Sequence, residues 1–288
     1  MNKTLGSTLI TSGTMIGAGM LAMPLTSAGI GFTFTVVLLV LLWILLTYSA
    51  LLFVEVYQTA EHDAGIGTLA AQYFGRPGRI VATSVLMIFL YALLSAYVTG
   101  GGAILASTLP DFATPDLKMK GSILAFTIFF GIFVAIGTSF VDALNRFLFI
   151  AMIAALFIVL GLMIPEIKID NLMAMPIDKA LLISASPVFF TAFGFHGSIP
   201  SLNKYLDGNV KSLRIAILVG SGITLFAYFL WQLSTHGLLS QNEFLQILRE
   251  DATLNGLVKA TLEITQSPII ANAVKIFSTL ALVTSFLG

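Results

Sequence analysis

Two stretches of the sequence place glycines, hydroxyl side chains and prolines inside otherwise apolar segments. The first is GTMIGAGM, residues 13–20, with Pro24 shortly after it. The second is FFTAFGFHGSIPS, residues 189–201, with Pro187 before it and Pro200 within it. Because glycine loosens a helix and proline removes one of its hydrogen bonds, each stretch predicts a helix that is interrupted along its length.

An interrupted helix can bind a small polar solute, because its two halves expose opposite backbone groups. Free N–H groups attract a carboxylate, and free carbonyl groups attract an ammonium group or a metal cation. A zwitterionic amino acid therefore fits such a break without any fixed charge on the protein. Close helix packing is the other interpretation of Gly13 and Gly17. Two breaks in corresponding positions, each near a proline, favour a transporter site.

Few ionisable residues lie in the apolar segments, and His196 is the one inside a predicted break. We expect it to face the protein interior, where it either serves the solute or a proton, or only satisfies freed carbonyl groups. Glu55 lies near the end of the second segment and is expected to pair with a basic loop residue, with ion coupling as the alternative. His62 and His236 are expected to be peripheral.

The apolar segments carry no acid–base pair, no metal-ligand spacing and no nucleophile motif, and the chain has no cysteine. The sequence therefore predicts that the protein is not an enzyme and that it needs no cofactor and no metal. Lys and Arg number 14, as do Asp and Glu, so the charge gives no reason to expect a nucleic-acid partner.

The elements that must position the two breaks are membrane helices. Of the 288 residues, 57% are hydrophobic and 10% are charged, whereas soluble domains carry roughly 25% charged residues. One crossing takes about 20 apolar residues, and a helix satisfies its own backbone groups in lipid. We expect an all-α integral membrane protein with about eight transmembrane helices, at residues 5–28, 32–57, 80–108, 121–141, 144–164, 180–201, 212–236 and 270–288.

The charged connections indicate how the chain lies in the membrane. Once the long loop 237–268 is left out, more basic residues fall on the side of the N-terminus, which predicts a cytoplasmic N-terminus. Within that loop, SQNE at 240–243 predicts a capping box and a short helix, and a second amphipathic helix is expected from residue 253. The last span ends without a polar flank, so residues 1–288 are expected to be a single transmembrane domain that lacks its C-terminal helices.

At the two predicted breaks the sequence resembles the hydroxy/aromatic amino acid permeases. The likeness is carried by GTMIGAGMLAMPL (13–25) and FGFHGSIPS (193–201), supported by NRFLF (145–149), YLDGN (205–209) and TSFLG (284–288). It implies a leucine-transporter-type fold of two inverted repeats, with helices 1 and 6 broken and the second repeat incomplete. It also implies a secondary transporter of the bacterial inner membrane that imports tyrosine by symport with protons.

The resemblance also implies roles for individual residues. It places the amino acid against Gly13, Thr14, Ile16, Gly17, Ala18 and Gly19 of span one, and against Phe193, Gly194, Phe195 and His196 of span six. In the wider fold, a hydroxyl pair on helix 8 can bind sodium, and Thr284 and Ser285 fall near that place. Because the family couples to protons, a structural role is preferred for both hydroxyls. Tryptophan, serine or threonine is the alternative substrate, and a channel-like protein without coupled transport is the alternative from another class.

Overall fold

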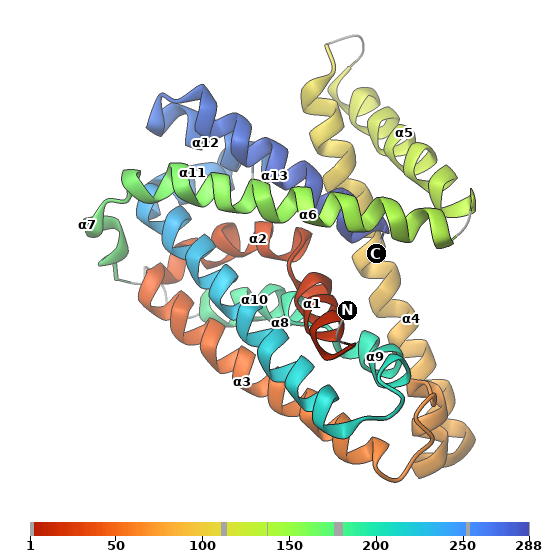
Figure 1. Ribbon diagram of the computed structural model, residues 1–288. Coiled ribbons are helices and arrows are strands. Elements are labelled where there is room, and N and C mark those ends of the chain that lie inside the picture. Colours follow the sequence, from red (N-terminus) through yellow and green to blue (C-terminus); the bar gives the residue numbers. More distant parts are fainter. Residues whose placement is uncertain (1–2, 111–113, 137, 176–180, 252–253, 288) are drawn as a thin grey trace.

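The computed structural model describes residues 3–110, 114–136, 138–175, 181–251 and 254–287. Within these ranges the protein is helical and contains no β-strand (Figure 1). The expected all-α class is therefore confirmed. In chain order the elements are α1 (Lys3–Met15), α2 (Ala18–Ser27), η1 (Ala28–Ile30), α3 (Gly31–Tyr57), α4 (Ile66–Thr108), α5 (Pro115–Ile136), α6 (Thr138–Met163), η2 (Ile164–Glu166), α7 (Ile169–Leu172), α8 (Leu181–Ala192), η3 (His196–Ser198), α9 (Ile199–Tyr205), α10 (Val210–Leu238), α11 (Gln241–Glu250), α12 (Leu254–Thr265) and α13 (Pro268–Leu287).

Six helical stretches in the described part of the chain are long and apolar enough to cross a membrane. They correspond to α3 together with α2, and to α4, α5, α6, α10 and α13. The two broken helices account for the difference from the expected count, because α1 has only 13 residues and α8 only 12. Large apolar side chains are exposed on the outer surface, as lipid contact requires. The protein is thus a multi-pass membrane protein.

Helix α4 differs from the prediction at its start. It begins at Ile66, whereas the sequence predicted a connection as far as residue 79. At Gly75 the backbone has a φ of 65°, a left-handed conformation that favours glycine, and the helix kinks there. The charged and glycine-rich stretch before residue 80 is therefore helical on both sides of a kink.

The centre of the protein is α10, which packs along α1 on one side and α3 on another (Figure 1). Gly220 makes the contact with α1 possible, because a Cβ there would lie 2.7 Å from Cβ of Thr11. Helix α2 packs against α8, and α13 packs against α6. The largest fully buried side chains include Trp231, Tyr228, Phe189, Phe193 and Phe277.

The long loop before the last helix contains two helices, α11 and α12, as predicted. The backbone N–H of Ser240 donates to Glu243 Oε2 at 2.7 Å, and the backbone N–H of Glu243 donates to Ser240 Oγ at 3.3 Å. This reciprocal pair confirms the capping box. Phe244 and Ile247 of α11 and Leu257 of α12 are buried, so both helices pack against the bundle.

Candidate functional site

The first predicted break lies between α1 and α2. Helix α1 ends at Met15, Ile16 and Gly17 are not helical, and α2 begins at Ala18. Gly17 is extended, with a φ of −176°. The interruption leaves the carbonyl end of α1 and the N–H end of α2 facing the same short gap in the chain.

The second predicted break lies between α8 and η3. Helix α8 ends at Ala192, and residues 193–195 lead into the short helices η3 and α9. A tight turn forms within this segment, where the N–H of Phe195 donates to the carbonyl of Phe193 at 2.9 Å. The prolines flank the break, with Pro187 inside α8 and Pro200 in the first turn of α9.

One side chain, Tyr228 of α10, connects the two breaks. Its Oη lies 2.6 Å from the carbonyl oxygen of Met15, the last residue of α1. The same Oη lies 2.9 Å from the carbonyl oxygen of Ala192, the last residue of α8. A phenol carries one proton, so Tyr228 donates to one of the two carbonyls at a time. The carbonyl ends of both broken helices thus converge on a single buried donor.

The N–H end of the first break faces α13. The backbone N–H of Ala18, the first residue of α2, donates to Oγ of Ser285 at 2.9 Å. A Cβ at Gly17 would lie 2.3 Å from that same oxygen, so glycine leaves the room that Ser285 needs. Uncharged hydroxyl groups therefore surround both polar ends of the break, which suits a solute without net charge.

The structure brings several predicted site residues together. Gly19 of α2 lies against Ala192 of α8, where an added Cβ would be 3.4 Å from its Cα. Phe193 is buried and its ring centroid is 5.1 Å from that of Tyr228. The buried residues Ile16 and Phe195 complete this cluster in the core.

Gly13 and Thr14 lie in the last turn of α1, before the first break, and Gly194 lies within the second break. A Cβ at Gly13 would be 3.1 Å from the ring of Phe149 on α6, so Gly13 serves close helix packing. Thr14 is exposed, and its hydroxyl donates to the carbonyl of Ile10 at 2.8 Å, within its own helix. The N–H of Gly194 closes the end of α8 by donating to the carbonyl of Thr191 at 2.9 Å.

His196 begins η3 and is partly buried. Its ring packs against Phe195, with centroids 5.2 Å apart, and against Phe53 of α3, with centroids 6.0 Å apart. Nε2 is buried and has no hydrogen-bond partner among the residues that the structure describes. The ring therefore has one nitrogen available for a further hydrogen bond.

Two other candidates for ion coupling, Thr284 and Glu55, already have polar partners. The hydroxyl of Thr284 donates to the carbonyl of Leu280 at 2.8 Å, within α13. Glu55 forms an ion pair with Arg214 at 2.5 Å, and both side chains are about half exposed. The expected pairing of Glu55 with a basic residue is thus confirmed, but that residue lies in the second turn of α10 and not in a loop.

His236 is not peripheral, and that prediction is wrong. Only 2% of its surface is exposed, and Nε2 lies 3.0 Å from Oγ of Ser27 on α2. The reason is that α11 covers the end of α10, with Phe244 and His236 ring centroids 5.1 Å apart.

Sequence reasoning also missed Tyr228. The available signal was a series of polar residues along one apolar helix, since Thr224, Tyr228, Gln232 and His236 follow each other at intervals of four. Residues four apart share a helix face, and these four are buried. A repeated polar face inside a membrane helix indicates a buried polar contact.

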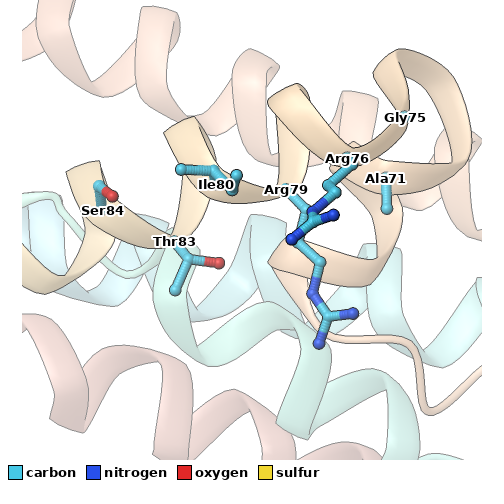
Figure 2. Close-up of a pocket in the computed structure, with 7 residues that line it drawn as sticks. All are labelled: Ala71, Gly75, Arg76, Arg79, Ile80, Thr83 and Ser84. Carbon is cyan, nitrogen blue, oxygen red and sulfur yellow. The ribbon is translucent and has the colours of Figure 1, made fainter.

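A hollow of about 640 Å³ lies on α4, near its kink, and Figure 2 shows the residues that line it. It is lined by Ala71, Gly75, Arg76, Arg79, Ile80, Thr83 and Ser84, and by no residue of either break. Its two guanidinium groups are exposed, unlike the buried cluster around Tyr228. Among the described residues, no group of three His, Cys, Asp or Glu side chains could hold a metal ion.

Comparison with known proteins shows that residues 1–288 match the tryptophan/tyrosine permease family. The chain is 74% identical to the tyrosine-specific transport system 1 of Haemophilus influenzae and 56% identical to the tyrosine-specific transport system 2 of the same organism. Each alignment covers 100% of this chain and 71% of the relative. The glutamine transporter 2 of Aliivibrio fischeri is 34% identical, over 99% of this chain and 72% of the relative.

Proposed function

The chain belongs to the tryptophan/tyrosine permease family, and from that membership we propose that it is a symporter that imports tyrosine across the bacterial inner membrane, driven by the proton gradient. It is a permease, not an enzyme. The observation that carries the proposal is the convergence of both broken helices on one buried point, at the hydroxyl of Tyr228. Relatives described as tyrosine-specific support the choice of solute.

The two ends of the break suit the two charges of an amino acid. The carbonyl groups of Met15 and Ala192 converge, and carbonyl ends of half-helices attract an ammonium group. The N–H of Ala18 points out of the start of α2, and such N–H groups attract a carboxylate. An aromatic substrate side chain would lie beside Phe193 and Phe195, which are buried next to the break.

The positions of the breaks also support a leucine-transporter-type fold. Broken helices at the first position of two inverted repeats create a binding site at the membrane midplane. In this proposal α1 with α2 and α8 with α9 take those two positions. In this proposal one repeat moves against the other to alternate access, and the N-terminus is cytoplasmic.

Proton coupling is supported over sodium coupling by the contacts of α13. A hard cation needs several oxygen ligands, whereas the oxygen of Ser285 already accepts a hydrogen bond from the N–H of Ala18. Thr284 bonds the backbone of its own helix. His196, with its available Nε2 beside the second break, is the residue that we propose to take part in proton transfer.

The test is uptake of labelled tyrosine by proteoliposomes in sodium-free buffer with an imposed inward proton gradient. Accumulation that disappears when the gradient is dissipated supports the proposal. Accumulation that requires sodium instead would overturn the proton coupling and keep the transporter.

Competition measures the choice of solute, since relatives in the family are described as transporters of tryptophan and of glutamine. An excess of unlabelled tyrosine should abolish uptake, whereas tryptophan, glutamine, serine and threonine should compete weakly. Stronger competition by tryptophan than by tyrosine would identify a tryptophan carrier.

A further inference from the structure

The backbone groups proposed to bind the amino acid already hold two hydroxyl groups of the protein. Tyr228 occupies the carbonyl ends of α1 and α8, and Ser285 occupies the N–H end of α2. We infer that these two hydroxyls are internal competitors of the substrate, which the ammonium and carboxylate groups displace on binding. This inference rests on the proposed function, and it adds what each residue does at the site.

At the carbonyl end, the competition is for one position. Oη of Tyr228 lies within hydrogen-bond distance of both Met15 and Ala192 carbonyl oxygens. An ammonium nitrogen that donates to both carbonyls must lie within hydrogen-bond distance of both oxygens. Oη of Tyr228 occupies that position. The hydroxyl of Tyr228 has one proton and cannot donate to both carbonyls at once. The substrate's ammonium group has three protons and can. When the ammonium group replaces the Tyr228 hydroxyl, both carbonyl groups therefore receive a hydrogen bond.

At the N–H end, Ser285 and the substrate carboxylate compete as acceptors for one donor, the N–H of Ala18. The N–H of Ala18 donates to Ser285, and a backbone N–H makes one good hydrogen bond. A substrate carboxylate is the better acceptor, because hydrogen bonds to charged groups are stronger than neutral ones.

The exchange has a mechanical result. Tyr228 joins α10 to α1 and α8, and Ser285 joins α13 to α2. When the substrate takes over these backbone groups, the hydrogen bonds that join five helices of the core (α1, α2, α8, α10 and α13) are released. The free energy of substrate binding thus offsets the loss of these hydrogen bonds, and the helices can then move relative to one another, as alternating access requires.

The sign of an affinity change tests the inference. A substrate ligand and an internal competitor differ here, because removing a ligand weakens binding and removing a competitor strengthens it. We expect Tyr228→Phe and Ser285→Ala each to lower the Kd of the purified protein for tyrosine about fivefold, since a net hydrogen bond is worth about that factor. Ser285→Thr keeps a hydroxyl and should leave the Kd within about twofold of the unmodified protein.

Tyr57→Phe is the matched control. Tyr57 is also buried and also donates through Oη to a backbone carbonyl, that of Ala64 at 2.6 Å, but it lies at the end of α3. Its removal should leave the Kd for tyrosine unchanged while lowering the melting temperature. A similar affinity gain in Tyr57→Phe would show a general loosening of the fold and would overturn the inference.

The outcomes separate the inference from the proposed function. If the unmodified protein binds tyrosine and both variants bind it more weakly or equally well, the competitor role is wrong and the transporter proposal stands. If the unmodified protein binds neither tyrosine nor tryptophan nor glutamine, the proposed function fails. The two positions test the idea independently, so an unfolded Tyr228→Phe leaves Ser285→Ala and Ser285→Thr to decide.

Discussion

Gly17→Ala is expected to destabilise the protein and lower uptake by a clash with a single atom. The backbone at Gly17 is extended, with a φ of −176°, a conformation that alanine adopts without strain. The effect must therefore come from space. The added Cβ would lie 2.3 Å from Oγ of Ser285, while the next atoms, Ser285 Cβ and the Ala281 carbonyl, are at 3.6 Å and 3.9 Å.

The size of the effect follows from how the clash is relieved. If Ser285 rotates its hydroxyl away, the N–H of Ala18 loses its acceptor, at a cost of about 1–3 kcal/mol. If the backbone shifts instead, overpacking costs about 1–3 kcal/mol. Because one atom causes the clash, Ser285→Ala should remove it. We expect Gly17→Ala to cost about 2 kcal/mol alone and almost nothing in the Ser285→Ala background, a coupling of about 2 kcal/mol.

The assay is thermal unfolding of the four proteins of this double-mutant cycle in one detergent, with uptake measured in parallel. Gly161→Ala in α6 is the control, since no described atom lies within 4 Å of a Cβ there, and it should leave stability unchanged or raise it. Gly17→Leu should abolish uptake in the unmodified and in the Ser285→Ala background, because the leucine side chain is larger than the space that removal of the Ser285 hydroxyl leaves. Additive costs for Gly17→Ala and Ser285→Ala would refute the reasoning.

The remaining predictions concern the histidines, the capping box and an exposed ion pair. His236→Ala should lower the melting temperature, because it removes a buried hydrogen bond worth about 0.5–1.5 kcal/mol, whereas His196→Ala should lower uptake more than stability; the reverse pattern would assign the site role to His236. Ser240→Ala should lower stability by about 1 kcal/mol, measured by thermal unfolding, and an unchanged melting temperature would contradict the capping role. The Lys3 ammonium, hydrogen-bonded to Asp207, holds the pKa of that carboxyl below its ordinary value of 3.8. A lowered folded-state pKa gives stability that is present above that ordinary value and is lost as the pH falls through the folded-state pKa, so the melting-temperature difference between the unmodified protein and Asp207→Asn should shrink on acidification.

The sequence predicted those features that depend on local composition. Membrane helices follow from long apolar runs, and both breaks follow from glycine and proline, whose backbone effects act within a few residues. The start of α4 was missed because charged residues and glycine at 66–79 resemble a loop, although α4 is helical on both sides of Gly75.

The contacts that define the site depend on tertiary structure and were not predicted. Tyr228 is 213 positions from Met15 and 36 from Ala192 in the sequence. Local sequence patterns therefore do not predict that its hydroxyl contacts both carbonyl groups. His236 lies at the end of an apolar run, where exposure is the ordinary expectation. Its burial comes from α11, which folds back over it.

The packing of the first broken helix has a mechanical implication. Its two halves have different principal neighbours: α1 lies along α10, held close by Gly220, whereas α2 lies mainly against α8 through Gly19 and makes a smaller contact with α10. Residues 16–17 are thus the seam between two bodies, α1 and α2, that pack mainly against different helices. A small rotation of one body against the other bends the chain where no helical hydrogen bond has to break, so the seam can act as a pivot while each body stays rigid.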